Sequence, residues 1–173
     1  EIYTLSLHDA LPIFAADHHG RFPDGEDERH QPIRSSNDAF RDLVPDYLDR
    51  ETVFTVPGSA TGNSADEKIE PVDQILRAGE NHFAYVAGLD DTSRSLWPLI
   101  ADGTDGSGRY LRKKGEPGGL WEGTRGILIR VDGSGELSRL RGEGSHRFIP
   151  RPDEPELNVL DVASYIGPNV RLL

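Results

Sequence analysis

The sequence predicts an α+β fold in which an amino-terminal helix packs on an antiparallel sheet of about four strands. Three observations support this prediction. Apolar residues recur at helical spacing within residues 35–48, strand-like segments follow at 82–89 and 97–102, and two strand-like arms at 127–140 flank an Asp-Gly-Ser-Gly turn. The helical patterns come before the strand patterns, which is typical of a fold with segregated helices and strands.

The first helix is expected to end near residue 20. Ala15, Ala16 and Asp17 suit a last helical turn, and Gly20 suits the position directly after it. Pro23 prevents the helix from continuing. A polar loop should follow.

A second, amphipathic helix is predicted from Ser35 onward. Ser35 stands three residues before Asp38, which is the spacing of a capping box. Five apolar residues then share one helical face: Phe40, Leu43, Val44, Tyr47 and Leu48. Pro45 should divide the segment into a helix and one further turn, because proline lacks the N–H that a helix interior requires.

The strands are predicted from runs of β-branched and aromatic residues. Thr52–Val56 is expected to be a short strand, followed by a polar loop at 58–70. Two further strands are expected at 82–89 and 97–102. Residues 103–126 are rich in glycine, which indicates a long surface loop.

The Asp-Gly-Ser-Gly hairpin gives the clearest local pattern. Ile127, Ile129 and Val131 alternate with other residues, so one face of the first arm should point into the core. A tight turn needs positive φ at one or two positions, which Gly133 and Gly135 can supply. We expect this hairpin to be structural.

The composition excludes several classes of protein. The chain has 173 residues, which fits one domain of modest core. Its net charge of -11 argues against general binding of nucleic acid. No apolar run approaches the roughly 18–20 residues of a membrane span. With Cys 0, the chain has no disulfide, thiolate zinc site or cysteine nucleophile.

Two groups of residues suggest metal ligands. His18 and His19, with Asp17 and Asp24 nearby, could bind a metal, but adjacent histidines at a helix end more often cap backbone carbonyls. We favour the capping role.

The second group is Asp102, Asp105 and Ser107 in a glycine-rich loop. Oxygen ligands close together on the backbone suit calcium, although the spacing is not that of an EF-hand. Asp-Gly pairs also form turns without a metal, so both interpretations stay open. No other cofactor is indicated.

No catalytic motif stands out in the sequence. Hydrolase and phosphate-binding signatures are absent. His82, two residues after Glu80, could be a general base or simply a packed side chain. Trp97 and Trp121 could form a carbohydrate platform, or could be a core residue and a loop anchor.

The beginning of the chain has an unusual composition. The sequence contains Met 0, and its opening EIYTLSLHDALPI is similar to translated sequencing-adapter read-through. We therefore expect residues 1–13 to be non-native and to pack poorly on the rest, with the true chain joining near Phe14. An ordinary helix is the alternative.

The order of several short motifs resembles a known pattern. A helix ending in AADHHGRFPDG is followed by SNDAF and LVP, then VPGSA, ENHFAYVAGL, PLIADG and the hairpin ILIRVDGSGEL. This order resembles pseudopilin-like proteins of the type II secretion and type IV pilin class. The greatest similarity is to the planctomycete and verrucomicrobial group with a histidine, nine residues and then Asp-Gly.

The resemblance implies a pilin-like head domain at 14–141, with a carboxy-terminal tail at 142–173 that contains a short helix. It further implies a structural, non-enzymatic subunit of a pseudopilus or pilus-like assembly, in the periplasm or at the cell surface. Its partners would be other pseudopilin subunits, and a missing amino-terminal helix would anchor the precursor in the inner membrane. In calcium-binding members the ion lies in a loop near the end of the sheet.

Two features depart from the family pattern. The apolar amino-terminal helix with its cleavage site is missing, which we attribute to truncation. Glu122, and not histidine, precedes Asp132 by ten positions.

The alternative function is that of a secreted hydrolase or carbohydrate-binding module with its site in the 103–126 loop.

Overall fold

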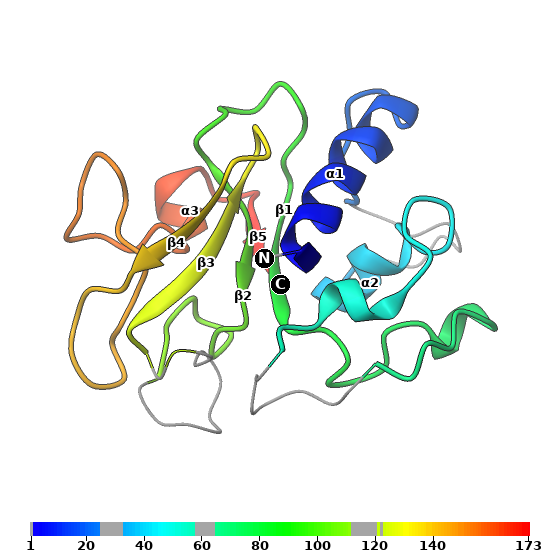
Figure 1. The fold of residues 1–173 in the computed structure, drawn as a ribbon. Helices are drawn as coiled ribbons and strands as arrows, with labels where there is room; N and C mark the ends of the chain where they lie inside the picture. The colour runs from blue at the N-terminus through cyan, green and yellow to red at the C-terminus, as the bar shows by residue number, and fades with distance from the viewer. Residues whose placement is uncertain (1, 25–32, 58–64, 112–120, 122) are drawn as a thin grey trace.

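A computed structural model shows one antiparallel sheet together with several short helices (Figure 1). It describes residues 2–24, 33–57, 65–111, 121 and 123–173, and of residues 2–6 the backbone only. The helices are α1 (Ile2–Asp17), α2 (Ser36–Arg41) and α3 (Val162–Tyr165), with two 3-10 helices, η1 (Glu51–Phe54) and η2 (Val72–Gln74). The strands are β1 (Phe83–Ala87), β2 (Pro98–Asp102), β3 (Arg125–Arg130), β4 (Gly135–Arg139) and β5 (Arg171–Leu172).

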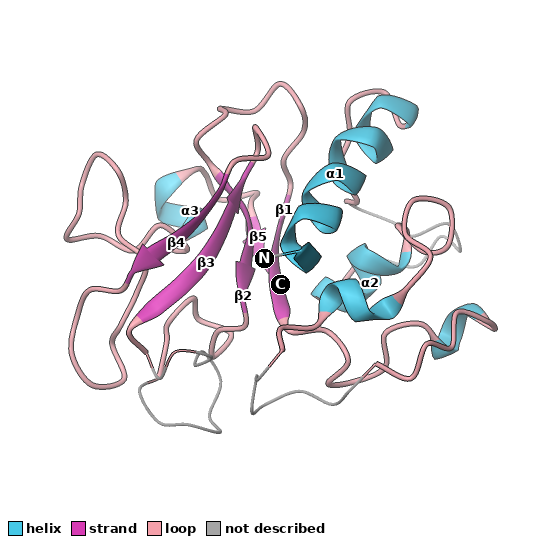
Figure 2. Cartoon of the chain, in the orientation of Figure 1, coloured by secondary structure: helices cyan, strands magenta, loops and turns pink. Residues whose placement is uncertain are grey.

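The five strands form a sheet in the order β4-β3-β2-β1-β5, and each neighbouring pair is antiparallel (Figure 2). The fifth strand comes from the end of the chain, where Leu172 pairs with Val86 and Arg171 pairs with Ala87. The predicted combination of an amino-terminal helix and an antiparallel sheet is confirmed, with five strands in place of about four. The segment 142–173 therefore contributes a strand to the sheet as well as helix α3.

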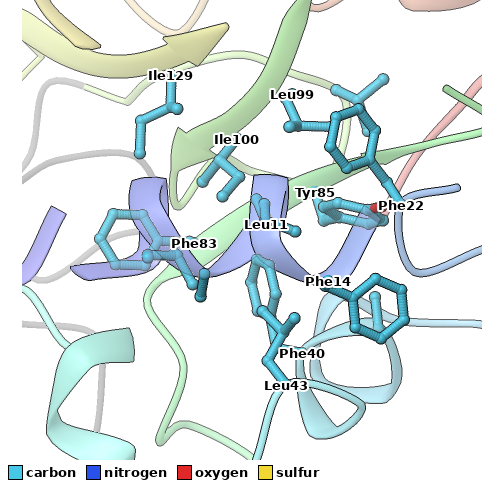
Figure 3. Close-up of a cluster of buried hydrophobic side chains, with 14 of the residues drawn as sticks. Leu11, Phe14, Phe22, Phe40, Leu43, Phe83, Tyr85, Leu99, Ile100 and Ile129 are labelled. Atoms are coloured by element: carbon cyan, nitrogen blue, oxygen red, sulfur yellow. The ribbon is translucent and has the colours of Figure 1, made fainter. Parts of the chain in front are cut away.

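Helix α1 packs on one face of the sheet. Leu7, Leu11 and Phe14 lie on one side of this helix and are at most 5% exposed. Their side chains belong to the larger of two hydrophobic clusters, which also holds residues of α2 and of β1–β3 (Figure 3). Among the helices that the structure describes, none has the length and hydropathy needed to cross a membrane.

The expectation that residues 1–13 pack poorly is wrong for the side chains described from residue 7 onward. Leu7 is 0% exposed and Leu11 is 1% exposed, both within the core. The physical reason is their spacing, since residues four apart lie on one side of a helix and here that side faces the sheet. The origin of the segment stays a prediction.

The opposite face of the sheet carries a second, smaller hydrophobic cluster. It consists of Ala101, Tyr110, Leu128, Leu140, Ile149, Val159 and Leu160. Tyr110 is fully buried, although we expected residues 103–126 to be a surface loop, so that interpretation is wrong at this position. Residues 112–120 and 122, which include the predicted equivalent of the family histidine, lie outside the described residues.

Both predicted helix boundaries are confirmed. Gly20 has a φ of 82° and donates its N–H to the Ala15 carbonyl, which ends α1 as a glycine cap. At α2 the Ser35 hydroxyl accepts from the Asp38 N–H, and the Asp38 carboxylate accepts from the Ser35 N–H. Helix α2 ends at Arg41, before Pro45.

The predicted strand at 52–56 is wrong, because the chain forms the 3-10 helix η1 at this place. Glu67 caps the turn, since its carboxylate accepts the N–H groups of Glu51 and Thr52. Val53 and Phe54 are buried in the larger hydrophobic cluster. Their β-branched and aromatic character therefore serves burial and not strand pairing.

The hairpin of β3 and β4 is confirmed. Ile129 is 2% exposed in the larger cluster, and Leu128 is buried on the opposite face, so both faces of β3 are covered. Gly133 has a φ of 80°, as the turn requires. Gly135, which we also expected to have positive φ, does not.

Candidate functional site

Asp102, at the end of β2, is a buried carboxylate with two hydrogen-bond donors. The Tyr110 hydroxyl donates to its Oδ1 at 2.7 Å, and the Ile127 N–H donates to the same atom at 3.0 Å. The residue is only 4% exposed. Burial raises the pKa of Asp102 from 3.8 to about 7, although the two donors oppose this shift.

Asp105 and Ser107 form a local turn in a separate hydrogen-bond network. The Ser107 N–H and hydroxyl donate to Asp105 Oδ1 at 2.9 and 2.6 Å. Asp132 and Ser134 repeat this arrangement in the hairpin, at 2.8 and 2.6 Å. The shared Asp-Gly-Ser sequence explains both turns without a metal.

The structure therefore does not bring the three predicted calcium ligands into one ligand set. Asp102 accepts from Tyr110 and Ile127, whereas Asp105 accepts from Ser107 and Arg109. Binding of calcium by this loop stays a prediction.

His18 caps the end of α1. Its Nδ1 donates to the Phe14 carbonyl at 2.8 Å, and the two rings stack with centroids 3.8 Å apart. This is the capping role that we favoured over metal binding.

The other candidates from the sequence also lie in structural surroundings. His82 Nδ1 accepts the N–H of Val56 at 2.9 Å, which ties η1 to the start of β1. Trp97 precedes β2 and Trp121 precedes β3. Because these strands are antiparallel, the two tryptophans lie toward opposite ends of β2 and do not form one platform.

A different group of acidic residues comes together beside η1. Glu51, Asp66 and Glu80 each place one carboxylate oxygen within 4.8 Å of the others. Glu51 and Glu80 are 0% and 3% exposed, whereas Asp66 lies partly open to solvent. We call these three residues the acidic cluster.

Glu51 is held by the backbone but is incompletely hydrogen-bonded. The Leu76 N–H donates to Glu51 Oε1 at 2.7 Å. The other oxygen, Oε2, is buried and finds no hydrogen-bond partner among the residues that the structure describes. Buried acceptor atoms in proteins nearly always receive a hydrogen bond, so a buried carboxylate oxygen without a donor is unusual.

Helix α2 fixes the segment that surrounds Glu51. The guanidinium of Arg41 donates to the carbonyls of Ile75 and Leu76, and the Asn37 side chain also donates to the Leu76 carbonyl. Leu76 has a φ of 49°, which bulky residues rarely adopt. These contacts hold the Leu76 N–H toward Glu51.

Two cations, Arg77 and Lys68, contact the acidic cluster. The guanidinium of Arg77 pairs with Asp66 and lies 3.5 Å from Glu80 Oε1, and the Arg77 backbone N–H donates to Glu80 Oε2 at 2.6 Å. Lys68 pairs with Asp66 from the more exposed side at 3.0 Å. Neither cation makes a hydrogen bond to Glu51 Oε2.

The electrostatic surroundings of Glu51 disfavour its charged form. Burial raises the pKa of Glu51, the Leu76 N–H partly opposes this, and the charges of Glu80, Asp66 and Glu67 raise it further. Such crowding of buried carboxylates is typical of sites that hold a proton or a cation.

The acidic cluster has no signature in the sequence. Glu51 precedes the segment predicted as a strand, Asp66 lies in a predicted loop, and Glu80 stands two residues before His82 without a motif of its own. No motif links residues so far apart in the chain, and only the return of the 66–80 segment against η1 brings them together.

Comparison of the chain with protein-family models, with curated proteins and with solved structures found no match.

Proposed function

We propose that the chain is the globular head of a pseudopilin-type subunit, a structural and non-enzymatic part of a type II secretion pseudopilus or a type IV pilus-like assembly. The observation that carries the proposal is the packing of the end of α1 on the antiparallel sheet through Phe14 and Ala15, which are 5% and 1% exposed within the larger hydrophobic cluster. This arrangement agrees with the family resemblance of the motif order.

In this proposal the upstream apolar segment and the globular head have different roles. An apolar segment upstream would continue α1, anchor the precursor in the inner membrane and later pack in the core of a fibre. The acidic head, with its net charge of -11, would stay in the periplasm or at the cell surface and contact other subunits.

The coding sequence upstream of residue 14 tests the proposal directly. An uninterrupted read of the native gene should show a prepilin-type cleavage site followed by an apolar run of about 20 residues that continues into α1. A cleavable secretory signal that ends before α1, with no apolar run joined to it, would contradict the proposal.

Site-specific cross-linking tests the proposed partners. With Cys 0 in the chain, one introduced cysteine is unique. In full-length protein expressed with its assembly, Ala16→Cys on the exposed side of α1 should cross-link to neighbouring subunits. Leu157→Cys is the control, since Leu157 is also exposed, at 41%, but lies far from α1 in the sequence. Absence of subunit cross-links from Ala16→Cys would count against packing of subunits through α1.

A further inference from the structure

We propose that Glu51, Asp66 and Glu80 form a binding site for a calcium-class divalent cation. This site is distinct from the 102–107 loop and independent of the pseudopilin proposal. The three carboxylates come from η1 and from the segment that returns past it, so the site exists only in the folded chain.

The spacing of the oxygens suits calcium. Calcium–oxygen distances of about 2.3–2.6 Å allow two ligands of one ion to lie up to roughly 5 Å apart. The ligand atoms of the acidic cluster all lie within 4.8 Å of one another. Magnesium holds its ligands at about 2.0–2.1 Å in strict octahedral geometry, which requires a tighter set.

The unpartnered Oε2 of Glu51 is the observation that points to a ligand. This oxygen is buried and accepts no hydrogen bond from any described residue, and the Glu51 carboxylate lies beside two others. A buried acceptor without a partner is costly, and the cost is greater when its neighbours are also negative. A divalent cation would satisfy this oxygen and relieve the repulsion together.

The site is preorganised on its buried side and open on the other. The Leu76 N–H fixes Glu51, and the Arg77 N–H fixes Glu80. Asp66 has a side chain that is 23% exposed, which leaves a path from solvent. Hydration water can complete the coordination shell from this open side.

Arg77 and Lys68 offset part of the negative charge when no metal cation is bound, and Arg77 contacts two of the three carboxylates. The guanidinium of Arg77 contacts Asp66 and Glu80, and its side chain is 45% exposed, so it can turn toward solvent without disturbing the core. We infer that Arg77 and the cation compete for these two carboxylates.

Calcium titration of the purified chain tests the proposal. After treatment with a chelator, calorimetric titration with calcium chloride at constant ionic strength should show saturable binding, and thermal unfolding should shift to higher temperature. Magnesium chloride should bind more weakly. A shift that sodium chloride reproduces at equal ionic strength would show charge screening only and would overturn the proposal.

Matched variants locate the site. Glu51→Gln keeps the acceptor for the Leu76 N–H but removes the charge, so calcium affinity should fall by more than about tenfold, since even outer-shell changes commonly lower metal affinity 10–100-fold. Asp105→Asn, in the other candidate loop, should bind calcium like the parent. The reverse pattern would overturn the proposal and place the ion in the 102–107 loop.

Two further variants keep the test decisive if Glu51→Gln does not fold. Asp66→Asn changes a partly exposed ligand and should also weaken calcium binding more than tenfold. Arg77→Gln should strengthen calcium binding because it removes the competing cation. Parent-like binding by Asp66→Asn, or weaker binding by Arg77→Gln, would contradict the proposed competition at this site.

Discussion

Asp102 and Glu51 are both buried carboxylates, but their surroundings differ in two respects. Asp102 Oδ1 receives the Tyr110 hydroxyl and the Ile127 N–H, and an apolar cluster surrounds it. Glu51 receives one N–H on Oε1, has no partner for Oε2 within the described parts of the chain, and lies beside two more carboxylates. Burial alone therefore does not distinguish a carboxylate with a structural role from the one that we propose as a metal ligand. The two differ in whether an acceptor oxygen is left without a donor and in whether other carboxylates lie beside it.

The largest expected effect that tests this comparison is the pH dependence due to Asp102. Its pKa rises from 3.8 to about 7 on folding, so the folded chain keeps a proton that the unfolded chain releases above about pH 4. The free energy of unfolding should fall as the pH rises from about 4 to 7, by an amount on the order of 4 kcal/mol from this group. Urea unfolding of the parent and of Asp102→Asn across this range measures the effect.

In Asp102→Asn this fall should be smaller, with a residual part from Glu51, whose pKa is also raised. Asp105→Asn is the control, because the pKa of Asp105 is lowered and its stabilisation is lost only as the pH falls through that value. Above pH 5 its slope should match that of the parent. Equal slopes for Asp102→Asn and the parent would show that Asp102 is charged throughout.

The next effect concerns the sheet that positions the donors of Asp102. Ile129 is 2% exposed and lies two residues after Ile127, whose N–H binds Asp102. Ile129→Ala should lower the free energy of unfolding by about 2–5 kcal/mol because it leaves a cavity. Urea unfolding with Leu137→Ala as control measures this, since Leu137 is 46% exposed and should change stability by less than about 0.5 kcal/mol.

A smaller effect should follow when one donor of Asp102 is removed. Tyr110→Phe takes away the hydroxyl and should cost about 1–3 kcal/mol, because a buried carboxylate then lacks a partner. The measurement belongs at pH 8, where Asp102 is ionised. Tyr47→Phe is the matched control, since the Tyr47 hydroxyl donates to an exposed Asp17 carboxylate. Similar losses in both variants would show that burial does not strengthen the Tyr110 contact.

The β3–β4 hairpin and the start of α2 could be predicted because their signals are local. The Asp-Gly-Ser-Gly turn fixes the β3–β4 hairpin, and the capping box at Ser35 fixes the start of α2. The fifth strand could not be predicted in this way. Residues 171–172 pair with β1, about 85 positions earlier in the chain, and such pairing leaves no local pattern.

The candidate site was the harder part for the same reason. The Asp102, Asp105 and Ser107 pattern is compact in sequence, yet the structure divides it between a buried network and an exposed turn. Glu51 lies where composition predicted a strand to begin, and a distant carboxylate, Glu67, caps a 3-10 helix there instead. Long-range side-chain contacts decided both outcomes, and sequence spacing does not reveal them.

The smallest expected effect on stability tests whether two hydrogen-bond donors make a carboxylate important when it is not buried. Asp132 accepts the N–H and the hydroxyl of Ser134, so it has two donors like Asp102, but it is exposed. Asp132→Asn retains an acceptor oxygen in the same turn and should change the free energy of unfolding by less than about 0.5 kcal/mol at pH 7. Asp132→Ala removes the acceptor altogether and should therefore lower the free energy of unfolding by more, about 1 kcal/mol. The loss should not be larger than this, because the exposed N–H and hydroxyl of Ser134 can bind water instead. Urea unfolding of both variants checks this order. A loss of several kcal/mol in Asp132→Asn would show that the charge of a carboxylate with two donors stabilises the fold even in solvent, and burial would then not be what makes Asp102 sensitive.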